Sequence, residues 1–382
     1  MSKQASTVVG IDLGNHSVKA VRLQKKGAQY VLARVANIPA NRESATGALV
    51  TEDTIATLLK QAASLVKVSG ADVHFTINAT NSTVRYVELP QIHLDEMRTA
   101  LKLNSTTYLR QNFENYTFDA CPLDQAAAAA LSGKAAKGAH GKIKVLVGGI
   151  ASSELVLYFH ASRRAGMKPR SMQLAPISLI NGFEAAYPEV FRTQAVALLD
   201  IGFLSSSLTI LDKGAPLLTR SVPMGGKQIT EYIAQMTSSD FPKAEAAKLK
   251  GETDVGDALT RTAVTLIREV RSSINFFEKN SDQPLSKVYL SGGSVRSAAV
   301  VEALSSDIGA TCEPWNAAQG LSIELPAEQQ EIFTQNQSSF AAALGAARTY
   351  TAAATTLAAA APAIAPAAPS ATATAVKPPK AA

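Results

Sequence analysis

The segment VVGIDLGNHSVKAVRLQ at residues 8–24 decides the fold of the first half of the chain. Its start, Val8 to Asp12, is almost entirely apolar, which predicts a short strand buried on both faces. The strand ends in an Asp-x-Gly turn at residues 12–14, and a second strand is predicted from Val18 to Leu23. Glycine lets a backbone approach a phosphate closely, and the amides and hydroxyls that follow can donate to its oxygens. The segment therefore predicts a strand–turn–strand unit with a candidate phosphate loop.

The same pattern returns near residue 200, where a second apolar strand ends in Asp200-Ile201-Gly202. In each half, three predicted strands are followed by an amphipathic helix and one more strand. The first set is 8–12, 18–23, 30–35, helix 54–66 and 73–77; the second is 195–200, 207–211, 216–222, helix 262–278 and 287–291. An internal duplication explains this repetition, and the predicted class is α/β.

Two Asp-x-Gly turns in matched contexts predict more than one turn would. A single such turn after a strand is more often an ordinary turn than a phosphate loop. If the halves face each other, Asp12 and Asp200 meet across a cleft, where two carboxylates suit a magnesium ion bound through its waters. The candidate phosphate ligands after the two turns are Gly14, Asn15, His16, Ser17 and Lys19, and Gly202, Ser205 and Ser206.

A third glycine turn, Ser291-Gly292-Gly293-Ser294, follows another apolar strand and precedes a helix-like segment at 298–308. One interpretation is a plain strand-to-helix turn. The other is backbone packed against a nucleotide. Together with the two Asp-x-Gly turns, this one favours the nucleotide.

Composition excludes several classes of protein. The 382 residues suffice for two or three cores. The formal net charge is +6, but the excess lysines fall in flexible-looking segments without interleaved aromatics, so we expect no nucleic-acid binding. The two cysteines, Cys121 and Cys312, and five scattered histidines predict neither a disulfide framework nor a structural metal. With neither a signal peptide nor a membrane span expected, the predicted location is cytoplasmic.

Two segments are predicted to lie outside the packed fold. Residues 125–142, rich in Ala, Gly and Lys, interrupt strand-like sequence and predict a long surface loop. Residues 351–382 are mainly Ala, Pro and Thr and cannot bury enough apolar surface to offset chain entropy. We predict a disordered tail there.

The ordered set of motifs resembles a known family. GIDLGNHSVKAVRLQ looks like the start of the PilM family of type IV pilus assembly proteins and of the division protein FtsA. VRYVELPQIHLDEMRTALKLNSTTYLRQNFENYTFD resembles the PilM inserted domain. Later blocks match in order: LLDIGFLSSSLTILDKGAPLLTRSVPMGGKQITEYIA, VYLSGGSVRSAAVVEALSSDIGATCEPWNAAQGLSI and SFAAALGAARTY. The resemblance covers nearly everything from residue 7 to 350.

That resemblance implies an actin-like, duplicated ribonuclease H-type fold, with two lobes around a nucleotide cleft and an FtsA/PilM-type inserted domain in the first lobe. The implied division has six parts. They are lobe I at 1–83 and 166–194, the inserted domain at 84–165, lobe II at 195–334, a C-terminal helix returning to lobe I at 335–350, and the tail at 351–382.

The resemblance also implies a site for ATP and Mg²⁺. Asp12 and Asp200 hold the metal, and the residues after the two turns surround the phosphates. The remaining implied ligands lie around adenosine: Gly225 and Gly226 at its base, Gly292, Gly293, Ser294 and Arg296 at base and ribose, and Glu245 and Lys248 at ribose. Glu245 and Lys248 lie on a predicted helix at 243–250, and an ordinary charged helix face explains them equally well.

One departure bears on catalysis, for which no residue is assigned. Where chaperones of the superfamily carry Glu before Pro, this chain has Ala175 before Pro176, and Ala175 can neither accept a proton nor orient water. Gln173 is a weak substitute. We therefore expect nucleotide binding with at most weak ATPase activity.

The implied function is that of the ATP-binding cytoplasmic component of the type IV pilus inner-membrane platform, and hence of twitching motility. It would bind the cytoplasmic N-terminus of a PilN-like inner-membrane protein beside the inserted domain, and reach the membrane only through partners. Self-association is left open. The alternatives are an FtsA-like division filament, which usually ends in an amphipathic membrane helix, a small-molecule kinase of the sugar kinase class, and the cytoplasmic part of a type II secretion protein.

Overall fold

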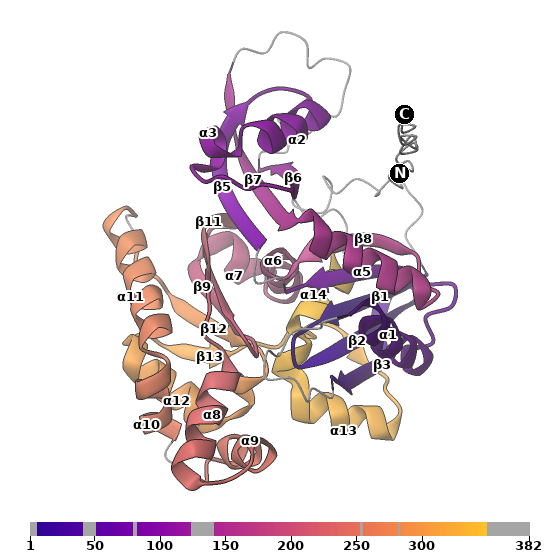
Figure 1. The fold of residues 1–382 in the computed structure, drawn as a ribbon, viewed down its shortest axis with the longest axis vertical. Helices are drawn as coiled ribbons and strands as arrows, with labels where there is room; N and C mark the ends of the chain where they lie inside the picture. The colour runs from indigo at the N-terminus through magenta and orange to yellow at the C-terminus, as the bar shows by residue number, and fades with distance from the viewer. Residues whose placement is uncertain are drawn as a thin grey trace, which may run out of the picture.

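The computed structural model describes residues 6–40, 51–78, 82–123, 141–252, 255–281 and 283–349. Most of the predicted loop at 125–142 and the whole predicted tail at 351–382 lie outside these ranges; within the loop, Lys142 already belongs to a strand. Three sheets organise the described chain, and each has its own apolar core (Figure 1).

The first lobe is built on a six-stranded sheet in the order β14-β3-β2-β1-β4-β8. Strand β1 pairs antiparallel with β2 and parallel with β4, which pairs parallel with β8. Every residue of β1 is buried, as its apolar sequence predicts. The strands are β1 (Thr7–Leu13), β2 (Ser17–Lys26), β3 (Gln29–Pro39), β4 (Asp72–Ile77), β8 (Pro169–Leu174) and β14 (Ser322–Ile323).

The second lobe repeats this plan in a five-stranded sheet, β11-β10-β9-β12-β13. Strand β9 pairs antiparallel with β10 and parallel with β12, so β9 corresponds to β1 and β12 to β4. The duplication predicted from sequence therefore holds at the level of strand order and direction. The strands are β9 (Ala195–Ile201), β10 (Ser206–Asp212), β11 (Ala215–Val222), β12 (Lys287–Ser291) and β13 (Cys312–Pro314).

Two helices of the second lobe, α9 and α12, begin after residues whose side chains cap them. Asp240 accepts a hydrogen bond from the amide of Lys243, and Ser297 accepts one from Val300. The predicted helix at 262–278 corresponds to α11, which begins two residues later, at Val264, because the preceding helix α10 ends at Thr262. The helices are α8 (Gly226–Thr237), α9 (Phe241–Lys250), α10 (Val255–Thr262), α11 (Val264–Lys279), η1 (Ser294–Arg296) and α12 (Ala298–Ile308).

A smaller unit is inserted between β4 and β8 and projects from the first lobe (Figure 1). Its antiparallel sheet, in the order β5-β7-β6, encloses a core that includes Met97, Leu101 and Phe113. The elements of this inserted unit are β5 (Ser82–Pro90), α2 (Leu94–Leu103), α3 (Ser105–Leu109), β6 (Tyr116–Pro122) and β7 (Lys142–Ala151).

Two of the predicted boundaries differ from the structure. The inserted unit was expected to continue to residue 165, but α5 (Ser152–Arg164) packs against α1 (Glu52–Val66), and its Tyr158 and Ala161 belong to the first-lobe core. The return to the first lobe was expected at residue 335. It begins earlier, because Trp315 and Phe333 also belong to that core, and α13 (Ala327–Asn336) packs on β3.

Two helices built from small residues lie at the centre of the molecule. They are α6 (Ala175–Ala186), which leads through α7 (Pro188–Thr193) to β9, and α14 (Ala341–Arg348), which follows η2 (Gln337–Phe340). A Cβ atom added to Gly345 would lie 1.9 Å from the carbonyl oxygen of Ser178 in α6, so the helices meet backbone to backbone. Similarly, Gly10 of β1 has room for no side chain, because its Cβ would lie 2.1 Å from the oxygen of Ala343. These contacts place both helices directly beneath the sheet of the first lobe.

No helix among the described residues is long and apolar enough to cross a membrane.

Candidate nucleotide site

A cavity lies between the two lobes, where the parallel strands of both sheets end. Asp12 is at the end of β1 and Asp200 at the end of β9. Strand β4 ends just before Asn78, β8 just before Ala175 and β12 just before Gly292. All five residues line the cavity. Ligands of open parallel sheets bind at this carboxyl edge, so the topology itself brings these segments together.

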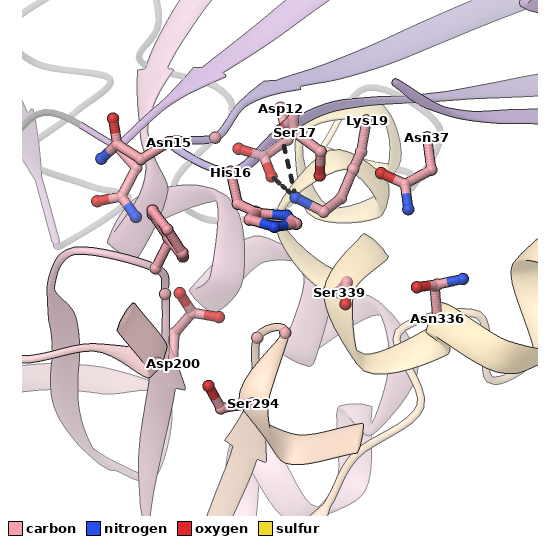
Figure 2. A pocket seen from close by; sticks show the side chains of 18 of the residues that line it. Asp12, Asn15, His16, Ser17, Lys19, Asn37, Asp200, Ser294, Asn336 and Ser339 are labelled. Atoms are coloured by element: carbon pink, nitrogen blue, oxygen red, sulfur yellow. Dashed lines mark hydrogen bonds and ion pairs between the residues drawn. The ribbon is translucent and has the colours of Figure 1, made fainter. Parts of the chain in front are cut away.

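The first turn supplies a cation and a carboxylate. Nζ of Lys19, on β2, lies 3.3 Å from Oδ2 of Asp12 and 3.4 Å from the carbonyl oxygen of Ser17 (Figure 2). Burial raises the pKa of Asp12, and the charge of Lys19 offsets part of that rise. Gly14 closes the turn, since a Cβ there would lie 2.8 Å from the oxygen of Ser17. Lys19 and Asp12 thus form an ion pair beside the tight turn at Gly14.

The second carboxylate faces this pair from below in Figure 2. The hydroxyl of Ser291 on β12 donates to Oδ1 of Asp200 at 2.7 Å. Burial raises the pKa of Asp200 to about 6, helped by the charge of Asp12 and opposed by the Ser291 hydrogen bond and the charge of Lys19. Two desolvated carboxylates that line one cavity could together accept a cation.

A buried ion pair forms the wall of the cavity on the second lobe. Lys248 is only 1% exposed, and its Nζ lies 2.6 Å from Oε2 of Glu245 and 2.8 Å from Oγ1 of Thr230. Burial lowers the pKa of Lys248 against the opposing charge of Glu245. For Glu245, burial alone would raise the pKa, but Lys248 lowers it overall. The sequence left open that Lys248 belongs to an ordinary exposed helix face. Its burial rules out that alternative.

Two glycines leave parts of the second-lobe wall as bare backbone beside the ion pair. At Gly226 a Cβ would lie 2.2 Å from Oγ of Ser294, and at Gly292, where φ is +101°, it would lie 2.2 Å from the oxygen of Ile201. The bare backbone at Gly226 and Gly292, the ion pair and the two carboxylates together fit a large polar anion bound with a cation. They are the surfaces that a nucleotide would occupy.

Most of the site residues predicted from sequence meet in this cavity. Those lining it are Asp12, Gly14, Asn15, His16, Ser17, Lys19, Asp200, Gly202, Gly226, Glu245, Lys248, Gly292, Gly293, Ser294 and Arg296.

Three predicted ligands do not line this cavity: Ser205, Ser206 and Gly225. The hydroxyl of Ser206 donates to the carbonyl of Met224 at 2.6 Å, and the carbonyl of Ser205 accepts the amide of Gly202 at 3.1 Å. Gly225 faces the turn at Gly202 and Phe203, because its Cβ would meet both of their carbonyl oxygens. These residues shape the second loop from behind. The substitute base Gln173 also lies elsewhere, accepting a hydrogen bond from Ser178.

The cavity also has lining residues that the sequence analysis did not assign: Asn37, Pro39, Asn78, Phe203, Asn336, Ser339 and Ala342. Two of these had a signal in the sequence: Phe203 directly follows the second Asp-x-Gly turn, and Asn78 is the first residue after a buried strand whose end shares an edge with Asp12. Figure 2 shows Asn37, Asn336 and Ser339 on the side of the cavity beyond Lys19.

Within the described ranges, no three His, Cys, Asp or Glu side chains form a group that could hold a metal ion. Asp12 and Asp200 would therefore bind a cation only with help from water and a bound anion, as magnesium commonly does.

A profile of the family described as type IV pilus assembly protein PilM matches residues 10–350. The chain belongs to the PilM family. Among solved structures, one described as a PilM-PilN type IV pilus biogenesis complex is similar, with a TM-score of 0.75 and 22% identity over 92% of this chain and 100% of that chain. The ethanolamine utilization protein EutJ from Carboxydothermus hydrogenoformans gives a TM-score of 0.48 and 14% identity over 91% of each chain. The PilM match confirms the expected two-lobed, actin-like fold with an inserted unit.

Proposed function

We propose that this PilM-family chain is the ATP-binding component of the inner-membrane platform that assembles type IV pili. The observation that carries the proposal is the convergence of both Asp-x-Gly turns and the Gly292-Gly293 turn on one cavity between the lobes. Asp12 and Asp200 would hold Mg²⁺, and Asn15, His16, Ser17 and Lys19 would contact the phosphates. Glu245, Lys248 and Arg296 would contact the ribose and base.

Magnesium would neutralise the charge of the phosphates and of the two carboxylates. Lys19 would then exchange its contact with Asp12 for a phosphate oxygen, and the backbone amides of both loops would donate to the remaining oxygens. The second lobe would keep Glu245 in place through Lys248 and Thr230. ATP bridging both loops would hold the two lobes in one relative position.

We propose slow turnover. Ala175 lines the cavity but carries no group that accepts a proton or orients water, and Gln173 does not line it. Of the three carboxylates that line the cavity, Asp12 and Asp200 would hold Mg²⁺, and Glu245 is engaged by Lys248 and Thr230. The nucleotide would therefore act as a structural ligand.

The proposed partner is the cytoplasmic N-terminal segment of a PilN-like inner-membrane protein. The similar solved structure is a PilM-PilN complex, and this chain has the inserted unit beside which such a segment would bind. Recruitment by that partner would place the protein in the cytoplasm, peripheral to the inner membrane.

Calorimetric titration of MgATP into the wild type, Asp12→Ala and Asp200→Ala tests the nucleotide site, with phosphate release followed in parallel. We expect binding to the wild type, loss of binding in both variants and little release. Wild-type protein that binds no nucleotide would overturn the proposal for the site. Rapid release of phosphate would contradict the structural role of the nucleotide.

Titration of the partner's N-terminal peptide into the protein tests the assembly role. If the peptide did not bind at high micromolar concentration, this role would be refuted.

A further inference from the structure

Asn78 is a cavity residue with no assigned role. It directly follows β4, and its side-chain amide reaches across the cleft toward the second loop: a Cβ atom added to Gly202 would lie 3.2 Å from its Nδ2. Within the described part of the chain, no hydrogen-bond partner is observed for its side chain. Asn78 thus offers a donor that no other described residue uses, between the strand of Asp12 and the loop that follows Asp200.

The strand register puts Asn78 beside the position where a catalytic side chain is missing. Ile77 pairs with Leu174 in the parallel β4–β8 ladder, so the next residues along the two strands are Asn78 and Ala175. Both line the cavity. At the ends of these two neighbouring strands the first lobe therefore presents an amide after β4 and only a methyl group after β8.

Asn78 also lines a second hollow, between the inserted unit and the second lobe. Edge strands of two different sheets form its walls. Thr83 and Arg85 lie on β5, and Thr219 and Ser221 on β11. Strand β5 begins at Ser82, a short distance along the chain from Asn78. Asn78 and Ser82, the first residue of β5, therefore line the same hollow, which brings the cavity residue beside the first strand of the inserted unit.

We propose that Asn78 recognises the terminal phosphate of a bound nucleoside triphosphate and couples that contact to the position of the inserted unit. The proposal rests on the proposed nucleotide site, in which Glu245 and Lys248 would hold the ribose, Asp12 and Asp200 would hold the magnesium ion, and Asn78 would contact the terminal phosphate. An amide N–H that donates to a phosphate oxygen is a charge-assisted hydrogen bond. A diphosphate would lack this contact, so Asn78 would favour triphosphate over diphosphate.

Calorimetric titration of MgATP and MgADP into wild type, Asn78→Ala and Asn37→Ala tests the recognition. Asn37 is the matched control, because it is another asparagine that lines the same cavity, on the far side of Lys19. We expect Asn78→Ala to lose about tenfold in ATP affinity, the scale of one hydrogen bond to a charged group, with little change for ADP. Asn37→Ala should change both affinities alike.

The outcomes separate this inference from the nucleotide site itself. A wild type that binds neither nucleotide overturns both. A wild type that binds both, with an ATP-to-ADP ratio unchanged in Asn78→Ala, overturns the role of Asn78 alone. Asn78→Asp adds a second check, since a carboxylate beside the terminal phosphate should weaken ATP more than Asn78→Ala does.

Hydrogen exchange tests the coupling to the inserted unit. Amides of β5 should exchange more slowly with MgATP than with MgADP in the wild type, and this difference should vanish in Asn78→Ala at saturating nucleotide. Equal exchange with both nucleotides in the wild type, or a difference that survives the substitution, would refute the coupling.

Discussion

The rings of His16 and Phe203 contact each other across the cavity, with centroids 4.9 Å apart and planes inclined by 52°. His16 belongs to the loop after Asp12 and Phe203 to the loop after Asp200, so the contact joins the two lobes at the cavity. Phe203 in turn meets Phe241 at the start of α9, the helix that carries Glu245 and Lys248. A continuous set of ring contacts therefore links the first Asp-x-Gly loop to the helix that carries the ion pair of the second lobe.

Replacing Phe203 by Ala should weaken MgATP binding about two- to tenfold, because a ring contact of this kind contributes roughly 0.5–1.5 kcal/mol. His16→Ala should have a similar effect, and the double variant should lose less than the sum of the two. Calorimetry on the four proteins measures the coupling. Phe276→Ala is the control, since this phenylalanine on α11 is 62% exposed and does not line the cavity. If the losses in binding free energy of the two single variants simply added in the double variant, the contact between the two rings would contribute nothing to MgATP binding.

Glu245→Ala should destabilise the protein by about 3 kcal/mol, because it leaves the buried ammonium of Lys248 without its counter-charge. The double change Glu245→Ala with Lys248→Met should recover much of that loss, since no buried charge then remains unpaired. Urea unfolding of the nucleotide-free proteins gives the free energies. A double variant no more stable than Glu245→Ala would mean that the pair stabilises by its packing alone.

The raised pKa of Asp200 predicts that a rise in pH lowers the stability of the nucleotide-free protein but strengthens magnesium binding. Its folded pKa of about 6 lies above the ordinary value of 3.8, so the folded state holds this proton more tightly than the unfolded state. The contribution of Asp200 to the stability of the nucleotide-free protein should fall as the pH rises from about 4 through about 6. The raised pKa of Asp12 acts in the same direction.

Magnesium needs the ionised carboxylate, so MgATP affinity should fall by up to about tenfold per pH unit below pH 6. Asp200→Asn should therefore raise the thermal stability of the nucleotide-free protein at pH 8 while abolishing magnesium-dependent binding. Melting temperatures and calorimetry at pH 5, 6, 7 and 8 check both statements. A less stable Asp200→Asn protein at pH 8 would contradict the raised pKa.

Gly345→Ala should destabilise the protein by about 3 kcal/mol or more, because the new methyl group would lie 1.9 Å from the carbonyl oxygen of Ser178 and force α6 and α14 apart. Gly141→Ala is the matched control. The nearest atom to its added Cβ lies at 3.9 Å, so its unfolding free energy should change little. If both variants unfolded at the same urea concentration, the backbone contact between the helices would not be as tight as the structure has it.

Local chemistry was enough to predict the two loops and their carboxylates. An apolar run ending in Asp-x-Gly specifies a buried strand and a tight turn without reference to the rest of the chain, and its repetition predicts the duplicated sheet. The late Gly292-Gly293 turn followed from the same reasoning. For this reason Asp12, Asp200 and most of the glycines were found in the cavity.

Tertiary structure decided what the loops alone could not. Ser205 and Ser206 follow the second turn as plausibly as Ser17 follows the first, yet the Ser206 hydroxyl bonds to Met224 and the Ser205 carbonyl to Gly202. Asn78, Asn336 and Ser339 belong to no motif, and they reach the cavity because β4 ends at the same sheet edge as β1 and because the chain returns to the first lobe after β13. Sequence specifies which residues can turn, cap or ionise; which of their atoms meet depends on strand register and on the direction of each side chain, and these are set only when the sheets and helices pack.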